Sequence, residues 1–175
     1  MPKFPPLTDD INKKFIYYFR SKFNSINNIN TINYMNSIKY TTLIGIHIRS
    51  IAQKKAENSK YLDISIEHRL LNLKIKLDNE YTSYQIFIIT DVLLYLDMAK
   101  NIFNNIYYLE DIARINTEKD SIPLLGKYTG YKLGSDIMNE CLALSLCDKI
   151  YISRSNIPFI VSMINPDTNH IMEEY

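Results

Sequence analysis

Apolar and mixed segments alternate along the chain from residue 41 onward. Short apolar runs rich in β-branched residues predict buried strands at 41–48, 84–90, 105–109, 149–153 and 170–172. The segments between them repeat apolar positions every three or four residues and predict helices at 63–78, 92–102, 135–147 and 156–164. Strands that alternate with helices imply right-handed crossovers. Because the strands are apolar on both faces, we expect an α/β fold with a Rossmann-like, doubly wound, mostly parallel sheet.

The first 40 residues follow a different pattern and predict no strand. A proline-rich start precedes an amphipathic helix at 9–23, and an Asn- and Ser-rich connector with room for a short helical stretch occupies 24–40. We therefore divide the chain into an N-terminal arm, helix and connector at 1–40 and a Rossmann-like domain at 41–175.

Length and charge narrow the class of protein. With 175 residues the chain has the length of one domain, and its 20 basic residues face 19 acidic ones, which gives no support to a nucleic-acid partner. Neither a signal peptide nor an apolar stretch of 18 residues is evident, so we expect no transmembrane segment. Cys141 and Cys147 match no zinc spacing and read as buried hydrophobes. A cytoplasmic location is predicted, and peripheral membrane association stays open.

Arginine and glycine are scarce, which makes each of them more informative. The chain has 5 arginines against 15 lysines, and only 4 glycines. Three of the glycines, Gly126, Gly130 and Gly134, fall close together in a stretch that we interpret as a loop, ahead of a helix opened by Gly134. Glycine permits close backbone approach to a ligand, so a ligand loop and a plain long loop are both compatible with this pattern.

Polar residues follow three of the predicted strands, where ligands bind in open parallel sheets. The first strand ends with His47 and Arg49 on one face, because side chains alternate along a strand. The second strand ends at Asp91. The fourth leads directly into a helix through Ser153, Arg154, Ser155 and Asn156. Guanidinium groups, hydroxyls and a helix N-terminus suit an anionic ligand, although a structural histidine and a simple helix cap explain the same residues.

Several common nucleotide and hydrolase motifs are absent from the sequence. It contains no Gly-x-Gly-x-x-Gly after a strand, no Walker A loop, no Asp-x-Asp and no Gly-x-Ser-x-Gly. Dinucleotide binding, P-loop chemistry, a metal-bridged diphosphate site and a hydrolase triad are therefore not indicated.

Three segments in order resemble the motifs of fucosyltransferases that use GDP-fucose, including the α1,2-, α1,6-, nodulation and protein O-fucosyltransferases. Residues 45–49, GIHIR, resemble the first motif, and residues 86–91, IFIITD, the second. Residues 140–148, ECLALSLCD, continuing into 152–156, ISRSN, resemble the third. The resemblance covers residues 41–165.

The resemblance implies a GT-B fold whose C-terminal, Rossmann-like half binds the nucleotide sugar. It implies inverting transfer, without a metal cofactor, from GDP-fucose or another GDP-sugar to a hydroxyl of a glycan or protein acceptor. Residues 1–40 are too short for the acceptor half of such an enzyme. The chain is then expected to be a donor-binding half whose N-terminal half is missing.

The same resemblance implies a role for each residue at the strand ends. Arg49 would hold the diphosphate and stabilise the leaving GDP in place of a metal. Guanine would be contacted by His47 and Glu140, and Asp136, one turn earlier on the same helix face, could share that role. Asp91 would lie beside the site, on the ribose or as an orienting acid. Phosphate oxygens would be bound by Ser153, Ser155 and Asn156, and Arg154 also falls where the diphosphate would sit.

Some positions depart from the family pattern and keep alternatives open. The second arginine that usually follows the first motif is absent, with only Lys54 and Lys55 nearby, and Glu140 stands where Asp is usual. One alternative is a degenerate, non-catalytic nucleotide-binding module. Another is an unrelated Rossmann-like domain in which the residues at the strand ends are structural.

Overall fold

The computed structural model describes residues 29–38, 41–49, 65–116, 130–153, 155–167 and 172–175. Several sequence predictions fall outside these described residues. They concern the helix at 9–23, Lys54, Lys55, Gly126 and Arg154.

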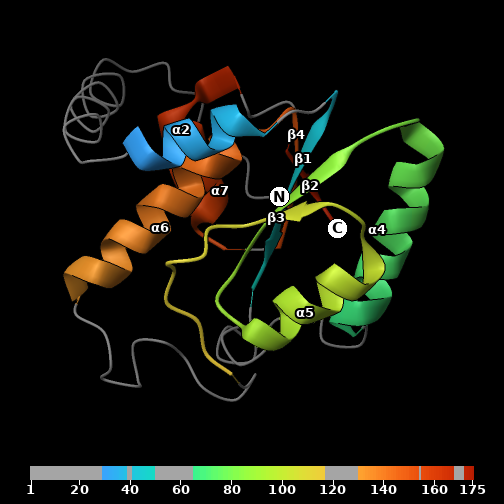
Figure 1. The fold of residues 1–175 in the computed structure, drawn as a ribbon, viewed down its shortest axis with the longest axis horizontal. Helices are drawn as coiled ribbons and strands as arrows, with labels where there is room; N and C mark the ends of the chain where they lie inside the picture. The colour runs from blue at the N-terminus through green and yellow to red at the C-terminus, as the bar shows by residue number, and fades with distance from the viewer. Residues whose placement is uncertain (1–28, 39–40, 50–64, 117–129, 154, 168–171) are drawn as a thin grey trace.

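A five-stranded parallel sheet forms the centre of the described structure (Figure 1). Its strands are β1 Leu43–Ile48, β2 Gln85–Thr90, β3 Ile106–Tyr107, β4 Lys149–Ile152 and β5 Met172–Glu174. They lie in the order β3-β2-β1-β4-β5, and every neighbouring pair is parallel. The prediction of a mostly parallel sheet is confirmed. Every residue of β1 is buried, as expected of a central strand between two helix layers.

Five helices of the described chain cover the two faces of this sheet. They are α2 Ile29–Ser37, α4 Ile66–Glu80, α5 Leu93–Ile102, α6 Gly130–Ser145 and α7 Ile157–Ile164. Helices α4 and α5 pack on the face that includes Ile46, and α2, α6 and α7 pack on the face that includes Phe87 (Figure 1). The doubly wound arrangement is therefore confirmed. Complete burial of an apolar side chain such as Ile46 or Phe87 stabilises the fold by roughly 1.5–3 kcal/mol.

Helix α4 illustrates how the local sequence sets an element's limits. Its four buried positions, Ile66, Leu70, Leu73 and Leu77, are those that the periodicity predicts. The helix begins at Ile66, because the Ser65 hydroxyl accepts a hydrogen bond from the His68 backbone N–H and so occupies the N-cap position.

The connection of the strands places a switch point at the carboxyl end of β1. The chain runs from β1 to β2 and β3 on one side, then returns through α6 to β4 on the other side of β1. Asp148 fixes this return, because its carboxylate accepts a hydrogen bond from the Leu43 N–H at 2.8 Å and its own N–H donates to the Leu43 carbonyl at 2.9 Å. The aspartate that ends the third motif-like segment thus joins α6 and β4 to the start of β1.

The connector contains a short helix, as the sequence allowed. This helix, α2, packs on α6, with the Thr31 hydroxyl donating to Asn139 Oδ1 at 3.1 Å. The prediction that Gly130 and Gly134 lie in a loop is wrong, because both belong to the first turns of α6. Glycine weakens a helix by about 1 kcal/mol relative to alanine. The ion pair of Lys132 with Asp136, at 2.8 Å on the same helix, helps offset that preference.

The cysteines behave as the sequence suggests. Cys141 and Cys147 are free and buried, and burial raises the pKa of both thiols well above the ordinary value. Neither is a reactive thiolate, because a raised pKa keeps the thiol protonated. In the part of the chain that the structure describes, no helix has both the length and the apolar character needed to cross a membrane.

Candidate functional site

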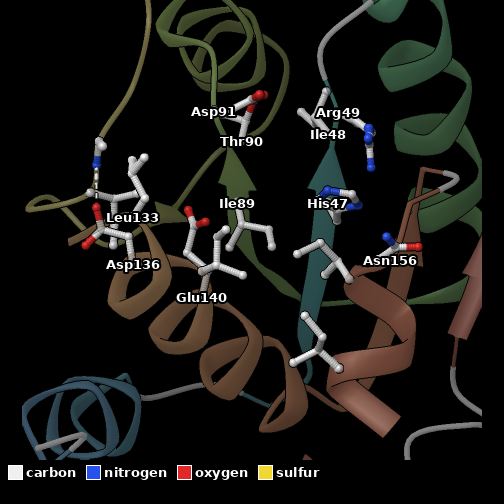
Figure 2. A pocket seen from close by; sticks show the side chains of 15 residues that line it. His47, Ile48, Arg49, Ile89, Thr90, Asp91, Leu133, Asp136, Glu140 and Asn156 are labelled. Atoms are coloured by element: carbon white, nitrogen blue, oxygen red, sulfur yellow. Dashed lines mark hydrogen bonds between the residues drawn. The ribbon is translucent and has the colours of Figure 1, made fainter. Parts of the chain in front are cut away.

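A pocket of about 310 Å³ opens at the carboxyl ends of β1 and β2, beside the switch point (Figure 2). Its walls are the ends of these two strands, the loop after β3, the inner face of α6 and the start of α7. The position agrees with the rule that open parallel sheets bind ligands beyond the carboxyl ends of their strands. The volume lies at the lower end of the range for small-molecule sites.

Most of the residues that the sequence singled out meet in this pocket. Those that line it are His47, Arg49, Asp91, Asp136, Glu140 and Asn156. His47 and Arg49 both line the pocket, as predicted from their alternation along the strand. In Figure 2, Glu140 projects from α6 beside Ile89, between Asp136 on one side and His47 on the other. Two strands and two helices, far apart in sequence, therefore supply one site.

Ser153 and Ser155 do not line the pocket, and both hydroxyls have partners within the fold. Ser153 is fully buried, and its hydroxyl donates to the His47 carbonyl at 3.1 Å and accepts from the Arg49 N–H at 3.5 Å. The Ser155 hydroxyl accepts from the Ile157 N–H at 3.1 Å, at the start of α7. These contacts hold β1 against β4 and shape the start of α7. A role of the two serines in phosphate binding stays a prediction.

Two residues that the sequence reasoning missed fix the end of β1 from its other side. The Tyr175 hydroxyl donates to the His47 carbonyl at 3.2 Å. Its ring lies 4.7 Å from the Arg69 guanidinium, which also donates to the Tyr175 backbone oxygen. Burial raises the pKa of Tyr175 to about 12, so the phenol stays a hydrogen-bond donor at neutral pH. The carboxyl end of β1, which carries His47 and Arg49, is thereby held in place.

The loop after β3 is tied to the pocket at several points. The Ile115 N–H donates to the Asp91 carbonyl at 2.8 Å, and the Leu93 N–H donates to the Ile115 carbonyl at 2.9 Å. The Asp136 carboxylate accepts from the Ala113 N–H at 3.0 Å and from Lys132 Nζ at 2.8 Å. Asp136 therefore anchors this loop to α6 in addition to lining the pocket.

These ties bring Arg114, which sequence reasoning also missed, next to Glu140. Its guanidinium lies 3.9 Å from Glu140 Oε1, and its side chain is only 5% exposed. The scarcity of arginine was the signal that could have found it, because Arg114 is one of only five. No strand-end rule points to it, since it follows β3 within an irregular segment.

Glu140 is the most unusual ionisable group of the site. It is 9% exposed, and its Oε1 accepts no hydrogen bond from the described residues. The pKa of Glu140 is raised to about 8, chiefly by burial; Arg114 lowers it, and the charges of Asp91 and Asp136 contribute to the rise. A carboxyl in a pocket whose pKa is strongly shifted is typical of a functional site. Burying an ionisable group costs free energy, and the stability of the fold alone does not require such a group.

The raised pKa of Glu140 predicts that stability falls as pH rises. The ordinary pKa of 4.5 applies to the unfolded chain, and the folded value is about 8. Stability from the protonated carboxyl is complete below pH 4.5 and is lost as pH rises through 8, on the order of a few kcal/mol in all. Glu140→Gln should remove this loss, and the change in melting temperature between pH 5 and 9 should shrink. The exposed Glu110→Gln is the control, and an unchanged pH slope in Glu140→Gln would contradict the assignment.

The chemistry available in the pocket is that of hydrogen bonds and charge. Acceptors from Glu140 and Asp91 face donors from His47, Arg49 and Asn156. Among the described residues, no group of three or more His, Cys, Asp or Glu side chains is arranged to hold a metal ion. Such a pocket suits a ligand that carries N–H donors at one end and anionic oxygens at the other.

Comparison with known proteins gives a structural match and no sequence match. No protein-family profile matches the sequence, and no curated protein does. A NodZ α-1,6-fucosyltransferase co-crystallised with GDP superposes on 90% of this chain with a TM-score of 0.53 and 14% identity. Fucosyltransferase NodZ from Bradyrhizobium superposes on 90% with a TM-score of 0.53 and 15% identity. The chain has the fold of one half of a fucosyltransferase.

The superposition covers most of this chain but only part of each fucosyltransferase. The chain covers 47% and 48% of the length of these two enzymes, so it spans about half of each. The expected α/β fold and its resemblance to fucosyltransferases are both confirmed at the level of structure. At this identity the likeness establishes the fold, and the activity is a separate question.

Proposed function

We propose that this chain binds a GDP-sugar and is the donor-binding, C-terminal-type half of a fucosyltransferase-like GT-B glycosyltransferase. The observation that carries the proposal is the pocket at the switch point. There the cationic end of β1, with His47 and Arg49, faces the buried carboxyl of Glu140 on α6. The fold of one half of NodZ, a fucosyltransferase co-crystallised with GDP, supports the same reading.

Each part of a GDP-sugar has a complement in this pocket. Guanine presents N–H donors at N1 and N2, which an ionised Glu140 carboxyl accepts, with His47 as the second contact to the base. The Arg49 guanidinium binds phosphate oxygens and stabilises the charge of the leaving GDP, which replaces a metal ion in that role. Asp91 contacts the ribose, and Asn156 contributes to phosphate binding beside Arg49.

The proposed reaction is inverting transfer of fucose, or of another sugar carried by GDP, to a glycan or protein hydroxyl. The bond between the anomeric carbon and the GDP oxygen breaks as the acceptor oxygen bonds to that carbon and loses its proton, so that the products are the glycoside, GDP and a proton. Acceptor recognition belongs to a second Rossmann-like half, which the proposal requires as a further segment or as a partner chain.

A second candidate is a nucleotide-binding module without transferase activity. The partners of Ser153 and Ser155 favour it, because their hydroxyls already bond to His47 and Ile157 within the fold. Fewer free donors are then left for the diphosphate than the fucosyltransferase motifs imply.

Calorimetry followed by a turnover assay tests both candidates. The protein is titrated with GDP and GDP-fucose, with UDP and ADP as controls for the base. Specific binding of the guanine nucleotides supports the shared site, and absence of any binding would overturn both candidates. Release of GDP from GDP-fucose, followed with an acceptor mixture and with water alone, then favours the first candidate. Tight binding without release in either assay favours the second.

A further inference from the structure

Arg114 lies outside the lining of the pocket, next to Glu140. It does not line the pocket, whereas Glu140 does. Its guanidinium is held by carbonyls of its own loop, with Nη2 donating to Leu109 at 2.9 Å and Nη1 to Ile112 at 3.4 Å. Nε donates to no acceptor among the described residues. The guanidinium is thus fixed by its loop, with Glu140 Oε1 lying 3.9 Å from Nη2.

The protonation state of Glu140 decides which purine edge it can recognise. An ionised carboxyl offers only acceptors and matches the two N–H donors of guanine at N1 and N2. A protonated carboxyl offers one donor and one acceptor, which matches the N1 acceptor and the 6-amino donor of adenine. One buried side chain can therefore favour either base, depending on its charge.

The other charged groups around Glu140 act in opposing directions. Asp91 at the end of β2 and Asp136 on α6 both raise the pKa of Glu140, while Arg114 lowers it. Lys132 pairs with Asp136 and so offsets part of its charge. His47 and Arg49, at the end of β1, line the same pocket, and α7 presents the neutral Asn156. Arg114 lies 3.9 Å from Glu140 Oε1, and its charge opposes the rise in the pKa of Glu140.

We propose that Arg114 is a positioning residue that stabilises the acceptor form of Glu140 and so favours guanine over adenine in the pocket. This inference rests on the proposed binding of a guanine nucleotide. The choice of base then depends on a residue outside the pocket wall. Guanine binding also becomes dependent on pH. Below the pH at which Glu140 ionises, GDP affinity falls and the advantage of GDP over ADP shrinks.

The test measures GDP and ADP affinities by calorimetry from pH 6 to 9, for the wild type, Arg114→Gln and Arg114→Lys. Gln retains an amide that can donate to the loop carbonyls but has no charge, whereas Lys keeps the charge. The wild-type GDP affinity should rise with pH and level off. In Arg114→Gln the midpoint of this rise should move up by about one to three pH units, so GDP affinity should still be rising at pH 9, where the wild type has levelled off and the difference between the two has begun to shrink. Arg114→Lys should stay close to the wild type.

A second variant keeps the test decisive if Arg114→Gln does not fold. Glu140→Gln offers one donor and one acceptor at every pH, so GDP affinity should become independent of pH and the ratio of GDP to ADP affinity should fall about tenfold or more. If Arg114→Gln weakens GDP by the same factor at every pH, its role is structural and the inference fails while the proposed function stands. If the wild type binds neither nucleotide, the proposed function fails first and the inference with it.

Discussion

Gly45→Val is expected to lower the free energy of unfolding by about 1–3 kcal/mol or more, because it forces side chains into a filled core. Gly45 lies in the middle of β1, on the face covered by α6. A Cβ at this position would lie 2.8 Å from Leu144 Cδ2 and 3.0 Å from Cys147 Sγ. Both of these residues are buried within one core cluster, so neither has open space to move into. Chemical denaturation followed by circular dichroism measures the loss.

Gly134→Ala is the matched control for this substitution. A Cβ at Gly134 meets no atom within 4 Å, and the residue lies in the helix α6. Alanine there should stabilise the protein by up to about 1 kcal/mol, since glycine is the weaker helix former. Equal effects of the two substitutions, or a neutral Gly45→Val, would show that α6 does not pack on β1 as closely as described. Because β1 also carries His47 and Arg49, GDP affinity should fall in Gly45→Val and stay unchanged in Gly134→Ala.

Arg49→Ala is expected to weaken GDP binding by about 10- to 150-fold, which corresponds to the roughly 1.5–3 kcal/mol of a charge-assisted hydrogen bond. Arg49 lies at the carboxyl end of β1, where the pocket opens, and it is only half-buried. Calorimetry with GDP measures the affinity, and a denaturation curve measures the stability.

Two further variants separate geometry from charge at this position. Arg49→Lys keeps the charge but loses the planar fork, so its GDP affinity should fall between those of the wild type and Arg49→Ala. Lys74→Ala removes a half-buried cation that pairs with Asp78 on α4, which covers the other face of the sheet, and should leave GDP affinity unchanged. If Arg49→Ala binds GDP with wild-type affinity, the diphosphate does not bind at the end of β1. A parallel loss in Lys74→Ala would indicate attraction by overall charge.

Local patterns in the sequence predict most of the fold, because strands and helices each leave a short-range signal. The buried runs predict β1 and β2 to within two residues, and the periodicity of residues 66–77 marks the buried face of α4. The signal fails where local preference and tertiary context disagree. Gly130 and Gly134 suggest a loop, but both lie in the first turns of α6, where Lys132 pairs with Asp136 one turn further along the helix.

Part of the candidate site could be predicted from the sequence, and part is seen only in the fold. His47, Arg49, Asp91 and Asn156 could be chosen from sequence by a rule about strand ends, and the family resemblance points to these four and to Glu140. Nothing local predicts that Ser153 bonds to the His47 carbonyl or that Tyr175 reaches the same atom. Such partners are selected by which strands lie side by side, and the order of strands in the sheet is a property of the whole fold.

The sequence by itself determined the alternation of elements, the parallel sheet and the polar residues at its carboxyl edge, because each depends on neighbours within a few positions. Only the tertiary structure decided how those polar residues act. Burial raises the pKa of Glu140, and Arg114 opposes that shift from a loop that bridges to Val92, just after β2. Asp136 anchors the same loop. The charge of a buried carboxyl depends on every group packed around it, and in this chain those groups come from separate elements that only the fold brings together.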